Sequence, residues 1–274
     1  MWRRRRRRSA AACVRPWMTD PAPQRPDLLF GAVSRDYAIH RPSYPDHFFE
    51  AFASRCPARE RVWDCGCGSG QASIALAQHF DQVVATDASA AQLQQAQPHA
   101  RVTYAEAAAQ ASGLEPKSVD GVLVAMAVHW FAGDAFNAEV RRVARAGAVM
   151  AWIGYRPFQL PLPALQTLID HFYGSELAPW WPPQRRWVDQ SYAGLPFPGE
   201  EWAFPDDLWI ERQWTLNDLL GYLSTWSAVE QARRHGSDPL ATLVEPLREA
   251  WPKRGEQRLL VRWPFMGRWG VISP

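Results

Sequence analysis

The stretch Arg61-Val62-Trp63-Asp64-Cys65-Gly66-Cys67-Gly68-Ser69-Gly70 decides how the rest of this sequence folds. A short β-forming run leads into alternating glycines, and residues 71–79 then carry Ala, Ile and Leu at helical spacing. Glycines at 66, 68 and 70 remove the Cβ atoms that would keep a ligand away from the main chain. They also permit the unusual dihedrals of a tight strand-to-helix turn. The segment therefore predicts a strand, a ligand-binding turn and a helix.

The same alternation extends outward on both sides of this turn. Short apolar runs predict strands at 61–65, 82–87, 101–104, 119–125 and 148–155. Helical periodicity predicts helices at 71–79, 90–97 and 134–145, and Gly147 stands where the last of these is expected to end. A further helix around Phe48 and Phe52 is expected to lie against the sheet. Strands that alternate with helices indicate an α/β fold with a predominantly parallel sheet.

The amino-acid composition changes after Tyr155, where proline and tryptophan become frequent. We expect an inserted lid at about 156–205. Its tryptophans Trp180, Trp181 and Trp187 have two open interpretations: packing within a small subdomain, or the wall of an apolar substrate pocket. Beyond the lid, the pattern predicts a strand at 208–214, helices at 216–228 and 240–251, and a closing pair of strands at 258–263 and 267–272.

Two other ligands are disfavoured at the glycine turn. A nicotinamide-cofactor turn requires Gly-x-Gly-x-x-Gly, and the third glycine is replaced by Gln71. An acid at Asp64 would also repel a pyrophosphate, whereas it suits the cationic ammonium end of an amino-acid-bearing cofactor. Cys65 and Cys67 lack two further ligands at a credible spacing, so we expect no metal site.

Asp87 ends the second predicted strand, 23 residues beyond Asp64. A carboxylate at this position can accept hydrogen bonds from both ribose hydroxyls of an adenosine, and the spacing agrees with the roughly 20 residues of such units. The alternative is a helix N-cap for the helix that begins at Ala90. The order of glycine turn and acid favours ribose binding.

Three further segments carry a resemblance to a known family. They are Tyr37-Ala-Ile-His-Arg-Pro-Ser-Tyr-Pro45, Val128-His-Trp-Phe131 and Gly221-Tyr-Leu-Ser-Thr-Trp-Ser227. With the glycine turn, they make the chain resemble class I S-adenosylmethionine methyltransferases, and more narrowly the trans-aconitate and farnesoate-type small-molecule subgroup. The resemblance implies a Rossmann-like three-layer sandwich, with a mostly parallel seven-stranded sheet whose last strand is antiparallel, plus a helical insertion rich in Trp and Pro.

The resemblance also implies a cofactor site for S-adenosyl-L-methionine. Asp64, Gly66 and Gly68 resemble the residues that hold the methionine portion, Asp87 resembles the ribose acid, and neighbouring Gly70 and Ala88 join this set. Near the adenine, Ala109 is followed by Gln110 where the family commonly has a Glu, and an amide still offers a donor and an acceptor. Ala125 and Met126 end the fourth strand and are expected beneath the cofactor, since ligands gather at the carboxyl ends of parallel strands.

Substrate contacts are expected from the leading segment and from the loop after the fourth strand. Tyr37 and Arg41 resemble residues that close over the site, where Arg41 would meet a carboxylate; the alternative for Arg41 is a surface cation. Trp130 is a candidate substrate contact. His129 is the candidate general base, because its ordinary pKa lies near 6.5, with substrate positioning or packing as the alternative.

Composition bounds the remaining expectations. The chain has 274 residues, of which 47% are hydrophobic and 21% charged, and no apolar run approaches the roughly 20 residues of a membrane span. Four clustered cysteines suit a reducing compartment, so we expect a cytoplasmic protein. Residues 1–29 are interpreted as a disordered tail, and 30–272 as the methyltransferase domain.

The run Arg3 to Arg8 has three open interpretations: a disordered tail or misassigned start, a targeting segment, or an arm for nucleic acid or membrane. Removing residues 1–17 takes away seven arginines and no acid, which lowers the formal charge from +2 to −5. The folded domain is therefore not expected to bind nucleic acid. We expect a small-molecule acceptor and a monomer or dimer. A protein or nucleic-acid methyltransferase, a non-catalytic cofactor-binding module and a dinucleotide oxidoreductase are the alternatives.

Overall fold

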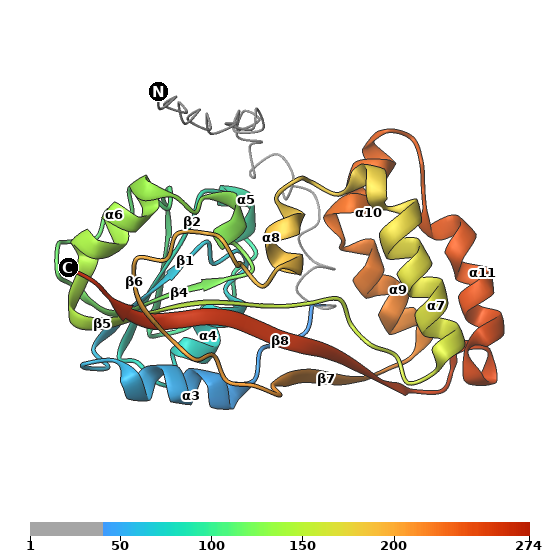
Figure 1. Ribbon diagram of the computed structural model, residues 1–274, viewed down its shortest axis with the longest axis horizontal. Coiled ribbons are helices and arrows are strands. Elements are labelled where there is room, and N and C mark those ends of the chain that lie inside the picture. The colour runs from blue at the N-terminus through green and yellow to red at the C-terminus, as the bar shows by residue number, and fades with distance from the viewer. Residues whose placement is uncertain (1–40) are drawn as a thin grey trace, which may run out of the picture.

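The computed structural model describes residues 41–274. The predicted tail at 1–29 and the candidate residue Tyr37 lie outside the described residues. Figure 1 shows an elongated molecule, with a sheet flanked by helices at one end and a group of helices at the other. The long strand β8 runs along both parts.

Eight strands form the sheet, in the order β3-β2-β1-β4-β5-β8-β6, with β7 paired to β8 outside this path. Their bounds are β1 Arg61–Cys65, β2 Gln82–Asp87, β3 Val102–Glu106, β4 Val119–Ala125, β5 Ala144–Tyr155, β6 Gly199–Trp202, β7 Trp209–Trp214 and β8 Leu259–Ile272. The first five pair in parallel, while β8 is antiparallel to β5, β6 and β7. The predicted Rossmann-like architecture is confirmed, with eight strands instead of seven.

The helices around the sheet form the two outer layers. Their bounds are α3 Asp46–Arg55, α4 Gln71–Leu76, α5 Ala90–Leu93, the 3₁₀ turn η1 Val128–Trp130 and α6 Asp134–Val143. The central strands are buried on both sides, and alternate residues enter different cores. Val62 packs with α3 and α4 in one core, whereas Trp63 packs with α6 in the other. Figure 1 accordingly shows α3 and α4 on one face and α6 on the opposite face.

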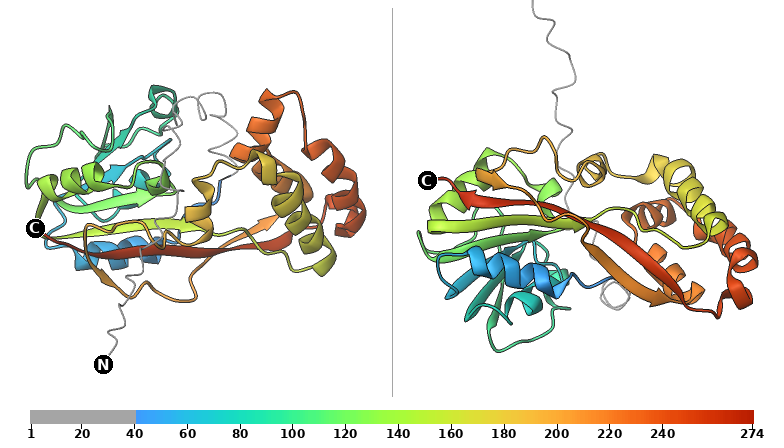
Figure 2. Two further views of the ribbon diagram at one scale, coloured as in Figure 1. Left: turned by 45° about the horizontal axis from the view of Figure 1, so that its top comes forward. Right: turned by 60° about the horizontal axis from the view of Figure 1, so that its bottom comes forward.

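The helices at the other end come from two separate stretches of the chain (Figure 2). The first stretch supplies α7 Pro163–His171, η2 Phe172–Glu176 and η3 Ala178–Trp180; the second supplies α9 Leu216–Ser224, α10 Ser227–Arg234, α11 Leu240–Ala250 and η4 Pro252–Gly255. We call this group the helical lobe. The short helix α8 Arg185–Asp189 lies between the lobe and the sheet (Figure 1). Strand β6 falls inside the 156–205 stretch that was predicted as a lid, and it pairs with β8 at the sheet edge.

The predicted closing pair of strands is wrong, because β8 is one continuous strand. Its first half pairs with β7 as far as Pro264, and its second half pairs with β5 from Phe265 onward. Pro264 has no N–H to donate, so it is tolerated where the strand changes partners. Gly267 makes no turn and passes close to the Trp152 carbonyl, with no room for a Cβ.

Several predicted helices are shorter in the structure. The helix predicted to reach residue 145 ends at Val143, because Ala144 already pairs with Val119 of β4. The helix predicted at 216–228 divides into α9 and α10. At this break Thr225 Oγ1 donates to the Tyr222 carbonyl at 2.7 Å, and the extended backbone at Trp226 turns its indole into the core. Local periodicity could not show these breaks, since tertiary pairing and packing cause them.

Candidate active site

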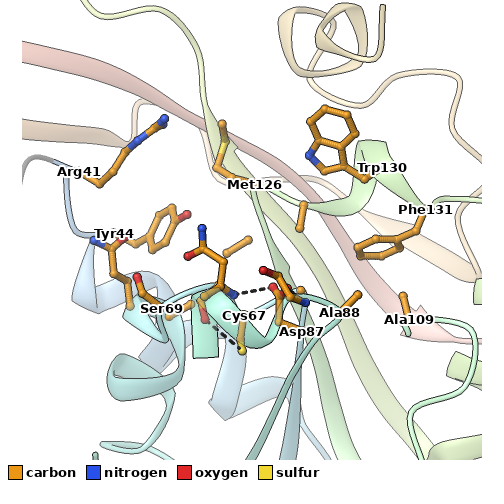
Figure 3. Close-up of a pocket in the computed structure, with 18 of the residues that line it drawn as sticks. Arg41, Tyr44, Cys67, Ser69, Asp87, Ala88, Ala109, Met126, Trp130 and Phe131 are labelled. Carbon is orange, nitrogen blue, oxygen red and sulfur yellow. Dashed lines mark hydrogen bonds between the residues drawn. The ribbon is translucent and has the colours of Figure 1, made fainter. Parts of the chain in front are cut away.

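A cavity opens at the carboxyl ends of β1, β2, β4 and β5, where ligands of open α/β sheets bind. It encloses about 1030 Å³ of empty space, counting the part that is open to solvent. In Figure 3, Arg41 and Tyr44 lie on one side of this cavity, Trp130 and Phe131 on the other, and Asp87 below. We call it the main cavity. Of the predicted site residues, those that line it are Arg41, Gly66, Gly68, Asp87, Ala88, Ala109, Ala125, Met126 and Trp130.

The glycine turn forms the floor of the main cavity. Gly66, Gly68 and Gly70 all have positive φ, between +55° and +84°. A Cβ at Gly66 would lie 2.7 Å from Ala127 Cβ, and one at Gly70 would lie 2.3 Å from the Tyr104 hydroxyl. At Gly68 a Cβ would meet only Gln92 Oε1, at 3.8 Å. Since Gly68 and Gln92 both line the cavity, the bare main chain at Gly68 leaves space for a ligand.

Asp87 joins the second strand to the glycine turn. Its Oδ2 accepts the Gly68 N–H at 2.8 Å and its Oδ1 accepts the Ser89 N–H at 2.9 Å. Burial raises the pKa of this carboxyl, while the backbone hydrogen bonds act in the opposite direction. Ser89, and not Asp87, is the N-cap residue of α5, and it makes no side-chain capping bond. Each carboxylate oxygen can accept a second hydrogen bond, so Asp87 can still receive ligand hydroxyls.

Asp64 lies behind the turn and does not line the cavity. Its side chain is fully buried, and Oδ2 accepts a 2.6 Å hydrogen bond from Ser73 Oγ. Within the described residues, Oδ1 has no hydrogen-bond partner. Burial raises the pKa of Asp64 to about 7, against the lowering effect of the Ser73 hydroxyl and with a smaller rise from Asp87. Gly70 also stays out of the cavity, because it begins α4 beneath Tyr104.

The end of β4 forms the back of the cavity. Ala125 and Met126 line it, and Met126 has a positive φ of 53°, which is uncommon for a side chain with a Cβ. The Met126 N–H donates to the Ile153 carbonyl at 2.8 Å. That same carbonyl accepts the hydroxyl of buried Tyr192 at 3.2 Å. These contacts hold the turn that presents Met126 to the cavity.

His129 does not line the main cavity, although its neighbour Trp130 does. Its half-buried ring lies between Trp130, whose centroid is 4.9 Å away, and Tyr192, which stacks at 6.4 Å. Burial lowers the pKa of His129 to about 3, and the positive charge of Arg185 adds to this shift. The imidazole is therefore neutral at physiological pH, and Nδ1 has no partner among the described residues. Gln110 is likewise outside the cavity, on an exposed turn.

The opposite wall comes from the leading segment and from β5. Arg41 Nη1 donates to the Tyr155 hydroxyl at 3.0 Å, and Nη2 donates to the Thr225 carbonyl at 3.0 Å. Arg41 therefore ties the leading segment to both the sheet and the helical lobe. Tyr44 packs against Tyr155, with ring centroids 6.3 Å apart.

Sequence reasoning missed several residues that line the main cavity. They include Tyr44, Cys67, Ser69, Gln71, Ser89, Gln92, Phe131 and Tyr155. Tyr155 ends β5, so the rule that ligands gather at strand ends would have found it. Phe131 belongs to the quoted His-Trp-Phe element. The polar residues of the glycine turn and of α5 carry no sequence signal of their own.

Comparisons with known proteins agree with this geometry. A family model described as a methyltransferase domain matches residues 63–152. A candidate methyltransferase of Dictyostelium discoideum is 30% identical over 245 residues, which are 88% of this chain and 93% of that protein. An uncharacterized methyltransferase of Mycobacterium tuberculosis is 37% identical over 122 residues, 44% of this chain and 49% of that protein. The solved structure of a candidate type II methyltransferase from Anaeromyxobacter dehalogenans has 47% identity and a TM-score of 0.78, and covers 85% of this chain and 99% of that one.

The fold, the glycine turn and these relatives together define the class. This chain belongs to the class I S-adenosylmethionine-dependent methyltransferases, and it is an enzyme whose cofactor is S-adenosylmethionine. The residues present fit that cofactor, since Gly68 leaves main chain bare beside Asp87 on the cavity floor. Within residues 41–274, no helix has the length and apolar character to span a membrane, and no cluster of three potential metal ligands occurs.

Proposed function

We propose that the enzyme methylates a small acceptor that carries a carboxylate, as the likeness to the trans-aconitate and farnesoate-type subgroup implies. The observation that carries the proposal is the position of Arg41, which lines the main cavity and is held by Tyr155 and Thr225. A guanidinium fixed in this way offers charged hydrogen bonds to an acceptor carboxylate. The helical lobe lies beside this cavity, since Arg41 donates to the Thr225 carbonyl, and a concave site of this kind suits a small molecule better than a macromolecule.

We propose the following roles for the cofactor residues. Gly66, Gly68 and Asp64 serve the amino-acid end, the last from behind the turn, where a cationic ammonium group nearby would favour the ionised form of its carboxyl. Asp87 receives the ribose hydroxyls while it holds the Gly68 N–H. Ala88 and Ala109 flank the adenine, and the exposure of Gln110 argues for a minor part at most.

When bound, S-adenosylmethionine supplies an electrophilic methyl group on a sulfonium. The residues of the chain then have to hold the acceptor atom in line, at about 3–3.5 Å from the methyl carbon. Arg41 and Trp130 orient the acceptor, and Met126 and Tyr155 bound the space around it. With both molecules bound, the acceptor oxygen would form the new C–O bond, and the electron pair of the C–S bond would stay with the sulfur. A carboxylate is already ionised at neutral pH, so no base is required, in agreement with the burial of His129.

The proposal is tested with labelled S-adenosylmethionine and a metabolite extract. We expect label in a small acid that becomes a methyl ester, identified by mass spectrometry and by its release in mild alkali. Arg41→Gln should raise the KM for that acid and leave the affinity for S-adenosylhomocysteine, measured by calorimetry, close to that of wild type. Label that appears only in protein or nucleic acid would contradict the small-molecule proposal.

A further inference from the structure

A second cavity adjoins the main one on the side of the helical lobe. It encloses about 340 Å³ of empty space, counting the part that is open to solvent, and it shares Arg41 and Tyr155 with the main cavity. The other residues that line it are Arg156, Pro157, Trp181, Arg185, Tyr222, Trp226 and Ser227. We call it the lobe cavity. The two cavities share Arg41 and Tyr155, whose side chains are hydrogen-bonded to each other at 3.0 Å, so a molecule that occupies both cavities would contact this pair.

The lobe cavity is cationic. Arg41, Arg156 and Arg185 line it, and no Asp or Glu occurs among the described residues of its lining. The helix α10 also begins there, at Ser227, and its amino end adds partial positive charge. Cations that are brought together without an acid in the wall attract an anion.

Arg185 is held in place by its surroundings. Its side chain is 21% exposed, and Nε donates to the Tyr173 hydroxyl at 2.9 Å and to Asp189 Oδ1 at 3.2 Å. The guanidinium carbon lies 5.0 Å from the centre of the Trp181 ring. Neither terminal nitrogen makes a hydrogen bond to any residue in the described range 41–274. These two nitrogens form a fixed, planar pair of donors, the geometry that binds a carboxylate with two hydrogen bonds.

Aromatic rings form the rest of the wall. Trp226 lies between Trp181 and Tyr222, with ring centroids at 5.5 Å and 5.8 Å. Flat apolar walls bind the hydrocarbon or aromatic body of a ligand, while the arginines bind its charge. The cavity thus combines both parts of a site for an organic acid.

We infer that the lobe cavity is a subsite for a carboxylate of the acceptor other than the group that is methylated, with Arg185 as its specificity-determining residue. The inference rests on the proposed function, because the acceptor must extend from the main cavity past Arg41 and Tyr155. The acceptors selected are then organic acids with a second anionic group. A neutral molecule of the same shape would leave the donors of the partly buried Arg185 without a charged partner, which is less favourable.

The test is calorimetric titration of the full chain saturated with S-adenosylhomocysteine. The probes are glutarate and benzoate, with glutaramide and benzamide as their neutral counterparts. We expect both acids to bind and the amides to bind at least tenfold more weakly. Arg185→Gln should weaken binding of the acids about tenfold or more, as for a lost charged hydrogen bond. The matched control Arg186→Gln, at the exposed neighbour that packs over Trp187, should bind them like wild type.

A second variant tests the inference independently if Arg185→Gln does not fold. Ser227→Asp adds a negative charge to the lobe cavity at the start of α10, where an acid suits the helix, and it should also abolish binding of the acids. Ser237→Asp adds the same charge at an exposed site and should not. Acids that bind equally to wild type and to Ser227→Asp, or that do not bind at all, would overturn the inference. Loss of S-adenosylhomocysteine binding by the wild type would instead overturn the proposed function.

Discussion

Replacing the turn glycines one at a time by alanine separates their structural and ligand-binding roles. Gly68 and Gly70 both have positive φ, at +55° and +84°. Gly236 provides the control, because it has φ +81° and no atom within 4 Å of its Cβ position. Gly236→Ala therefore measures the cost of the backbone conformation alone, about 1–2 kcal/mol of unfolding free energy.

The surroundings of each glycine set the size of the effect. At Gly68 an added methyl would lie at an ordinary contact distance of 3.8 Å from Gln92 Oε1, so Gly68→Ala should lose the same 1–2 kcal/mol as the control. At Gly70 the added methyl meets the Tyr104 hydroxyl at 2.3 Å and two ring carbons at 2.9 Å. Overpacking of this kind adds about 1–3 kcal/mol, so Gly70→Ala should lose about 2–5 kcal/mol in total.

Affinity for the cofactor should follow a different order. Gly68→Ala places a methyl in the main cavity, so its Kd for S-adenosylhomocysteine should rise at least tenfold, which corresponds to about 1.4 kcal/mol. Gly236→Ala should keep the wild-type Kd. The assays are urea denaturation for stability and calorimetry for binding. Wild-type affinity in Gly68→Ala, or a larger loss of stability there than in Gly70→Ala, would refute the reasoning.

Three further outcomes are expected from buried polar groups. The pKa of His129 is lowered from 6.5 to about 3, so the free energy of unfolding falls as the pH drops below 6.5. Urea denaturation at several pH values should show a slope of about 1 kcal/mol per pH unit in this range, and His129→Asn should remove it. The pKa of Asp64 is raised from 3.8 to about 7, so the free energy of unfolding falls as the pH rises through that interval. This dependence has the opposite sign to that of His129, and Asp64→Asn should abolish it. Asp120 accepts the Glu60 and Arg61 N–H groups at 2.9 and 3.0 Å, and Asp120→Ala should lower unfolding free energy by about 2–4 kcal/mol.

The sequence predicted the central part of the fold because that part is local. Strand β1, the glycine turn and α4 follow one another within residues 61–76, where a short β-forming run is followed by glycines and then by apolar residues at helical spacing. Asp87 was predicted as a ligand contact because it ends the second predicted strand at the spacing after Asp64 that such units have. His129 had the right residue type in the right loop, but its ring stacks on Tyr192, 63 positions further along the chain, and does not line the cavity.

The residue types and spacing at 64–87 predicted a ligand-binding turn from the sequence, since a turn that binds through bare main chain needs glycine at fixed positions, and the family resemblance carried by this segment implied the class of enzyme and its cofactor. Tertiary structure alone decided the lobe cavity. Its arginines come from the leading segment, the end of β5 and α8, and its aromatic wall includes α9 and the residue before α10. No local pattern links these stretches. They meet because β8 pairs with β5 in the sheet and with β7 beside the helical lobe, so the lobe lies next to the carboxyl ends of the parallel strands.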